Sequence, residues 1–245
     1  SVTRIMYGAF RKCTSLTSIS IPSSIDSIAT SAFSYCASLA SITIAQGLSY
    51  IGDSAFRNCT SLTSIVIPSG VTTIGKYAFV RNTSLASVSL PSSLKIISLG
   101  TFKNCTGLIS LTIAPGVITI GDSAFCGCSS LTNAVIPSGV TSIGKSTFNN
   151  CTALSSVSIP SSVTKIYERG FYSCRSLTSV ICLATTPPTL SGSNQFYNNP
   201  TSHILHVPNG RANSYKGNAA WNAAFGNNII DDASTSSSGK NYLNK

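Results

Sequence analysis

The apolar positions of this chain recur with a period of 23 residues over most of its length. Within one period, positions 1, 4 and 18 are aliphatic, with Ala134 the smallest residue at position 18, while position 9 is always phenylalanine and position 15 always leucine. One turn of chain cannot shelter such an apolar face alone, so an unbroken period predicts a solenoid of stacked turns. The eight units begin at Val2, Ile25, Leu48, Val71, Leu94, Val117, Val140 and Val163.

Each unit divides into two segments of different pattern. The segment L-T-S-I-x-I is β-branched and alternating, which predicts a short strand with one buried face. A proline often follows, and it ends the strand because it cannot donate a ladder hydrogen bond. The segment I-G-x-x-A-F-x-x-C has apolar residues three and four apart, which predicts a short helical or 3₁₀ turn on the opposite side of the coil.

The combined pattern L-x-x-I-x-I-P-x-x-V-x-x-I-G-x-x-A-F-x-x-C resembles the BspA-like class of leucine-rich repeats, a 23-residue type found in surface proteins of host-associated bacteria and some parasitic protists. The resemblance implies an α/β repeat solenoid, a right-handed superhelix shaped like a horseshoe. It places a parallel β-sheet on the concave side and short helical or 3₁₀ turns on the convex side. It also implies an adhesin-type protein that is extracellular or lies on the cell surface.

The pattern divides the chain into three regions. Residues 1–183 contain the eight repeats, and residues 184–230 form a capping segment with a short strand at His203 to Pro208 and a helix around Tyr215 to Phe225 that contains Trp221. Residues 231–245 are rich in serine and lack apolar periodicity, which predicts a disordered tail or a linker to a further domain. Repeats that begin in phase at Val2 indicate either further turns upstream or an exposed end that pairs with another chain.

The composition predicts a folded chain with a mostly neutral surface. Of 245 residues, 42% are hydrophobic and only 9% are charged. Sixteen basic and six acidic residues give a formal net charge of +10, which favours acidic glycans or other anionic surfaces as partners; we expect no nucleic acid. No stretch of about 18 apolar residues occurs, so the sequence predicts no membrane-spanning helix.

Positions 17 and 19 of each unit are expected to point outward from the concave sheet and to form a candidate binding face. These positions carry short, almost uncharged side chains and lack the Trp, Tyr and Arg anchors typical of tight interfaces, so binding there should be weak and broad. The candidate face consists of Ser18, Ser20, Ser41, Thr43, Ser64, Val66, Ser87, Ser89, Ser110, Thr112, Asn133, Val135, Ser156, Ser158, Ser179 and Ile181.

Positions 10 and 11, beside the repeated phenylalanine, predict a basic stripe on the convex side or its edge. Ordinary solubilising charge explains such residues; the alternative is a contact for sulfated glycans or acidic proteins. In the second case, retention on heparin should weaken with salt and with Arg57→Ala plus Arg81→Ala. The stripe consists of Arg11, Lys12, Arg57, Arg81 and Lys103.

The cysteine, histidine and acidic residues do not indicate a disulfide, a metal site or a catalytic site. Seven of nine cysteines occupy position 12 and are expected to be a buried column of thiols rather than disulfides. The pair Cys126 and Cys128 has no further ligand nearby, and His203 and His206 would lie on opposite faces of a strand, so we expect no metal site and no cofactor. With only six scattered acidic residues, no catalytic set can be assembled, and we expect no enzyme.

Four N-x-[ST] sequons would be glycosylation sites in a eukaryotic secreted protein, although the repeated phrase N-C-T explains three of them equally well. They lie at Asn58, Asn82, Asn104 and Asn150.

The sequence therefore favours a non-enzymatic binding module that adheres to host or neighbouring-cell proteins or glycans. A structural alternative is a spacer or a self-associating scaffold. A third interpretation, ice or crystal-surface binding through the Ser/Thr ladder, is weakened by Val66, Val135 and Ile181.

Overall fold

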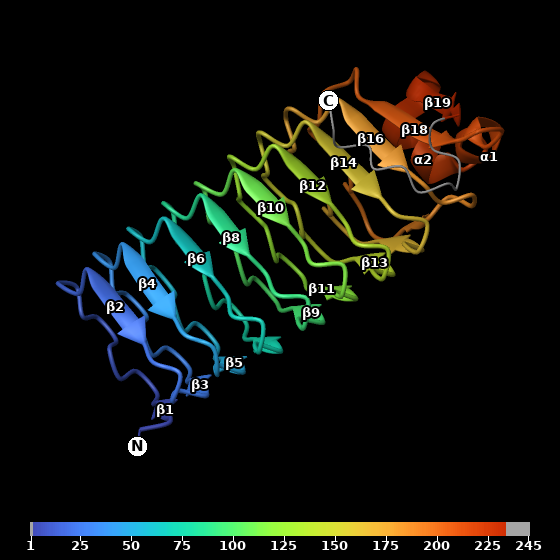
Figure 1. Cartoon of the computed structure of the whole chain (residues 1–245). Coiled ribbons are helices and arrows are strands. Elements are labelled where there is room, and N and C mark those ends of the chain that lie inside the picture. Colours follow the sequence, from blue (N-terminus) through green and yellow to red (C-terminus); the bar gives the residue numbers. More distant parts are fainter. Residues whose placement is uncertain (1, 234–245) are drawn as a thin grey trace.

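The computed structural model describes residues 2–233, which form an elongated solenoid of stacked turns. The N-terminal end of the chain lies at one end of the stack and two short helices cover the other (Figure 1). Strands lie along two sides of every turn, so two ladders run the length of the molecule (Figure 1).

The longer strands form the main ladder, and all of their pairings are parallel. Equivalent repeat positions pair, as Ser18 does with Ser41 and Ser64 with Ser87. Hydrogen bonding divides the ladder into three sheets, β2-β4, β6-β8-β10 and β12-β14-β16-β18-β19. Its strands are β2 (Ser18–Ile21), β4 (Ser41–Ile44), β6 (Ser64–Val66), β8 (Ser87–Ser89), β10 (Ser110–Thr112), β12 (Asn133–Val135), β14 (Ser156–Ile159), β16 (Ser179–Cys182), β18 (Ile204–Pro208) and β19 (Ile229–Asp232).

A second ladder of two-residue strands lies across the interior from the first. Position 4 of each repeat ends one of these strands with a buried side chain, as Ile28 and Ile51 do. Its strands are β1 (Arg4–Ile5), β3 (Ser27–Ile28), β5 (Tyr50–Ile51), β7 (Thr73–Ile74), β9 (Ile96–Ile97), β11 (Thr119–Ile120), β13 (Ser142–Ile143), β15 (Lys165–Ile166) and β17 (Thr189–Leu190).

The expectation of helical or 3₁₀ turns opposite the sheet is wrong for the repeats. Between residues 2 and 211 the structure contains strands and turns but no helix. Positions 7 and 11 adopt positive φ in every repeat, as Ser31 (59°) and Tyr35 (65°) do, and a left-handed residue interrupts a right-handed helix. The amides at positions 7, 9 and 11 instead donate to the next turn, for example Phe33 to the carbonyl of Ala55 at 2.8 Å. The apolar residues three and four apart therefore belong to a tight corner of the coil. Backbone hydrogen bonds to the next turn stabilise this corner.

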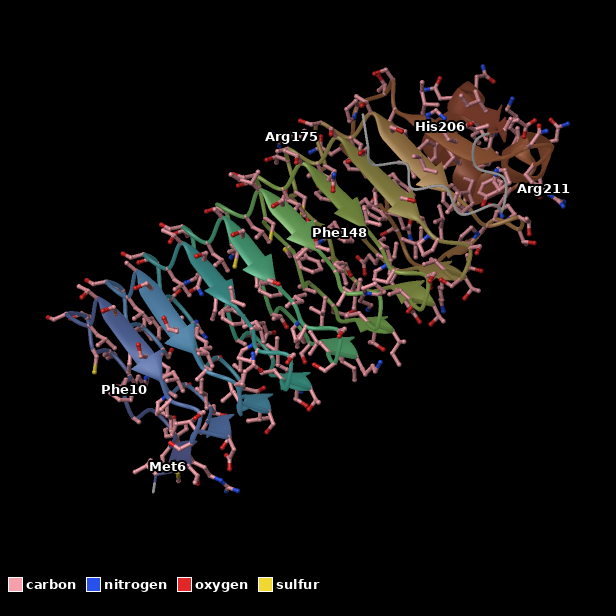
Figure 2. The ribbon with its side chains drawn as sticks, viewed as in Figure 1. Met6, Phe10, Phe148, Arg175, His206 and Arg211 are labelled. Carbon is pink, nitrogen blue, oxygen red and sulfur yellow. The ribbon has the colours of Figure 1, made fainter. Side chains whose placement is uncertain are left out.

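A continuous file of phenylalanine rings fills the interior. Adjacent rings lie 5.0–5.7 Å apart between centroids and within 15° of parallel, from Phe10 to Phe196. Figure 2 shows Phe10 in the first turn and Phe148 farther along the stack. Each such pair contributes about 0.5–1.5 kcal/mol beyond its buried area. Phe196 belongs to a ninth turn, which the period misses because 25 residues rather than 23 separate it from Phe171.

The position-12 cysteines form a second internal column beside the rings. All nine cysteines of the chain are free thiols, and those of this column are buried except Cys13 in the first turn. Each buried thiol of the column donates to the carbonyl of the phenylalanine one turn earlier, as Cys59 Sγ does to Phe33 O at 3.2 Å. Burial raises the pKa of the Cys59 and Cys105 thiols to about 12, so they remain protonated and inert near neutral pH.

The C-terminal end is closed by α1 (Ala212–Lys216), α2 (Ala219–Phe225) and the 3₁₀ turn η1 (Gly226–Asn228). Trp221 and Phe225 pack on Phe196, with ring centroids 5.7 and 4.9 Å away, and Trp221 donates its indole N–H to the Pro188 carbonyl at 2.7 Å. Asp231 and Asp232 belong to β19, although the sequence places them in the tail, and residues 234–245 of that tail lie outside the described residues.

Candidate binding surfaces

The sixteen residues at positions 17 and 19 lie on the outward side of the main ladder, and we refer to them as the serine/threonine face. In β6, β8 and β10 both positions are exposed, and the residue between them is buried. In β14 and β16 the same positions are half-buried. Val66 is 70% exposed, which makes it the most open apolar side chain on this face. The most accessible part of the face therefore lies in the first five turns, where both positions are exposed.

The basic positions do not form one continuous stripe. Arg11 and Lys12 are exposed in the first turn, but the second turn has Ser34 and Tyr35 at the equivalent positions. Arg57, Arg81 and Lys103, from three consecutive turns, line a single hollow of about 240 Å³. We call this hollow the basic pocket.

Neutral residues form the rest of the basic pocket. The positions of the basic residues in the sequence do not indicate which neutral residues these are. Tyr77, Val80 and Asn104 form the rest of its lining. Tyr77 lies directly against Gly100, where any side chain would collide with its ring. The sequence signal for this arrangement is a large residue at position 7 followed by glycine at position 7 of the next turn.

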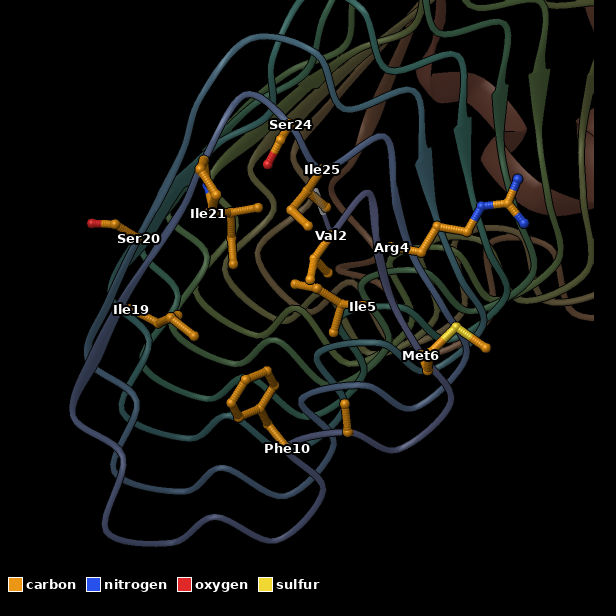
Figure 3. A pocket seen from close by; sticks show the side chains of 12 residues that line it. Val2, Arg4, Ile5, Met6, Phe10, Ile19, Ser20, Ile21, Ser24 and Ile25 are labelled. Carbon is orange, nitrogen blue, oxygen red and sulfur yellow. The ribbon is translucent and has the colours of Figure 1, made fainter.

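The N-terminal end of the solenoid exposes apolar side chains. Val2, Met6 and Tyr7 are 72%, 66% and 68% exposed, and a hollow of about 460 Å³ opens into the first turn. Figure 3 looks into this hollow, where Ile5 of β1 and Ile19 of β2 point into the coil while Ser20 points out of it. We call this surface the open end, because Val2 is exposed here whereas the equivalent position-1 residues of the later repeats are buried.

The histidines are part of the C-terminal cap. His203 is buried, and its Nε2 contacts the Ala224 carbonyl at 3.0 Å, while His206 Nδ1 contacts Asp232 Oδ2 at 3.2 Å. Cys126 is half-buried beside the buried Cys128. Across residues 2–233, no group of three or more His, Cys, Asp or Glu side chains could hold a metal ion.

The four sequons differ in accessibility. Asn150 is exposed, Asn58 and Asn104 are half-buried, and Asn82 is fully buried. An enzyme that attaches a glycan must reach the side-chain amide, so the folded chain presents Asn150 best and does not present Asn82.

These features define a class of protein, a parallel-stranded β-solenoid of about ten turns built from leucine-rich repeats. A family model described as BspA type Leucine rich repeat region, with six copies, matches residues 1–108 and 80–203. The chain belongs to this family.

Solved structures with a similar fold are bacterial leucine-rich repeat proteins. One from Bacteroides ovatus is 28% identical, with a TM-score of 0.52, over 84% of this chain and 67% of that chain. One from T. pallidum is 27% identical, with a TM-score of 0.58, over 76% of this chain and 78% of that chain. A leucine rich cell surface protein from Faecalibacterium prausnitzii is 23% identical, with a TM-score of 0.46, over 96% and 84% of the two chains.

The comparison with curated proteins gave no match. Within residues 2–233, the helices are all too short or too polar to span a bilayer.

Proposed function

We propose that this chain is a non-enzymatic binding module, located on the cell surface or secreted, that attaches to proteins or glycans of a host or neighbouring cell. The observation that carries this proposal is the serine/threonine face, which extends in register along the main ladder. At about 4.8 Å per strand, the eight strands that carry this face extend over roughly 34 Å. Repeat proteins commonly use such extended surfaces for binding.

The side chains of this face favour broad and adaptable contact. Serine and threonine hydroxyls donate and accept hydrogen bonds, and their short side chains lose little entropy when they are ordered. Charged and large aromatic anchors are absent from its sixteen residues, so each contact is weak and affinity depends on the number of turns engaged. A glycan chain or a flat protein surface fits these properties.

The experiment that tests the proposal is capture of host matrix or mucosal components by the immobilised chain. The variant Ser87→Glu plus Ser110→Glu places two carboxylates on the exposed face, and we expect it to reduce capture. The matched control is Thr73→Glu plus Thr119→Glu, which adds the same charge at exposed positions of the second ladder. Capture no greater than a blank surface, or equal loss in both variants, would contradict binding through this face.

A further inference from the structure

The basic pocket brings three cationic side chains together from three consecutive turns. Arg57 occupies position 10 of the third turn, Arg81 position 11 of the fourth and Lys103 position 10 of the fifth. Consecutive turns are separated by about one strand spacing, so the three attachment points lie within roughly 10 Å along the solenoid axis. Three positive charges around one hollow repel each other unless an anion lies between them.

Carboxylates of the described residues do not balance these charges. The ion pairs in residues 2–233 join Arg4 to Asp26, Arg169 to Glu168 and His206 to Asp232. Asp53 and Asp122 instead accept hydrogen bonds from the backbone N–H groups of Lys76 and Lys145, both at 2.7 Å. The three cations of the pocket are therefore available for an external anion.

The side chain of Arg57 is partly ordered and still lacks an acceptor. Its guanidinium lies over the Tyr35 ring, 5.7 Å from the centroid, which orients the planar fork. Its Nε atom is buried and has no hydrogen-bond partner among the described residues. A buried donor without a partner is unfavourable, and because Arg57 also lines the hollow, its guanidinium is placed to donate to an oxyanion there.

The walls of the pocket limit the size of the ligand group. Tyr77 is fixed against Gly100, and Asn104 packs in the same way against Gly127, so a side chain at either glycine would displace a wall residue. A hollow of about 240 Å³ holds one tetrahedral oxyanion and part of the group that carries it.

We propose that the basic pocket binds a single sulfate or phosphate monoester group carried by a glycan. This inference deepens the proposed function, on which its choice of a glycan rests, by naming an anionic group of the partner and the residues that bind it. Arg57 and Arg81 provide paired N–H donors to the ester oxygens, and Lys103 adds a third charge.

A nucleic acid fits the distribution of charge less well. Polynucleotide affinity comes from neutralising many phosphates along a track of basic residues. The equivalent positions are Ser34 and Tyr35 in the turn before the pocket and Cys126 and Gly127 in the turn after it, all neutral. The basic pocket is therefore a local site for one anionic group.

The test measures binding by calorimetry to a monosulfated disaccharide, with its desulfated form, inorganic sulfate and a short single-stranded oligonucleotide as further probes. We expect the sulfated disaccharide to bind, sulfate to compete with it, and the desulfated form not to bind. The variant Arg57→Gln plus Arg81→Gln should weaken binding roughly tenfold or more, because it removes two charged donors to the oxyanion. Arg81→Gln alone, at an exposed position, should weaken binding without any effect on the core.

The matched control is Arg211→Gln plus Lys216→Gln, which removes two charges from the exposed surface of the C-terminal cap, where Figure 2 shows Arg211. Equal binding of the desulfated disaccharide, equal loss in the control, or tighter binding of the oligonucleotide through the same arginines would each overturn the proposal. If the chain binds the sulfate ester selectively but captures nothing from host extracts, the proposed function is wrong. The assignment of the basic pocket as an anion site is then still supported.

Discussion

The side-chain oxygen of Asn82 accepts a 2.9 Å hydrogen bond from the backbone N–H of Cys59, one turn earlier in the stack. Asn82 takes the place that the other seven repeats give to cysteine, and it is fully buried. Its Nδ2 atom has no partner among the described residues. Asn199 repeats this arrangement in the ninth turn, where its side chain accepts from the Cys174 N–H at 2.8 Å and its Nδ2 is also without a partner.

Replacing Asn82 with cysteine should stabilise the solenoid. The change removes a buried donor without a partner, which costs about 1–3 kcal/mol, and offsets part of that gain by losing the bond to Cys59. We expect a net increase of about 1 kcal/mol in the free energy of unfolding, measured by urea denaturation under reducing conditions. Asn82→Ala is the control, because it removes the same amide without supplying a thiol. If Asn82→Cys is no more stable than Asn82→Ala, the column of thiols contributes nothing specific.

The file of rings predicts that the same substitution has different costs at the end and in the middle. Phe79 is fully buried between two rings, whereas Phe10 is half-exposed and stacks on Phe33 alone. Phe79→Ala should cost about 3–5 kcal/mol, and Phe10→Ala roughly half as much. Because each turn contacts only its neighbours, the cavity at Phe79 should also broaden the unfolding transition. Equal costs at the two positions would show that the rings do not act as a continuous core.

The sequence predicts the buried side of this molecule well, because burial repeats with the period. Phenylalanine at position 9 and cysteine at position 12 identify the two internal columns without any structural information. The corner between them was predicted as a helical turn because apolar spacing does not report the sign of φ. The asparagine, glycine and serine residues common at positions 7 and 11, such as Asn58 and Gly127, were a signal that left-handed backbone is present.

The surface is less predictable, because the period fixes the direction of a side chain but not its neighbours. Arg57, Arg81 and Lys103 are recognisable as basic residues near one edge. They do not share one repeat position, because Arg57 and Lys103 lie at position 10 and Arg81 lies at position 11. They share one hollow with Tyr77, whose ring lies against Gly100, and the repeat period does not encode this contact between turns.

The buried thiols predict a loss of stability at alkaline pH. Burial raises the pKa of Cys59, Cys105 and Cys174 from about 9 to about 12. The unfolded chain therefore loses these protons first, so the stability contribution is complete below pH 9 and is lost as the pH rises from 9 towards 12. The limiting slope is about 1.4 kcal/mol per pH unit for each thiol.

Cys59→Ala should accordingly make the free energy of unfolding less dependent on pH between 9 and 11, by up to about 1.4 kcal/mol per unit. The measurement is a set of urea denaturation curves at fixed pH values. Cys13→Ala is the matched control, because it removes a thiol of the same column at an exposed position. A slope that is the same in both variants would mean that the Cys59 thiol is not shielded from solvent.

The packing of the C-terminal cap predicts that Trp221 keeps the C-terminal end of the solenoid from associating with other copies of the chain. Trp221 is fully buried, packs on Phe196 and donates to the Pro188 carbonyl. Trp221→Ala should cost about 3–5 kcal/mol and uncover the last ring of the file. An apolar end uncovered in this way offers the same kind of surface as the open end, so the variant should form oligomers that grow with concentration in light scattering. The control is Asn222→Ala, an exposed change in the same helix, which should have the stability and the association state of the wild type. If Trp221→Ala unfolds at the wild-type urea concentration and does not associate, the helices of the cap are dispensable, and the stack is closed by β18 and β19 alone.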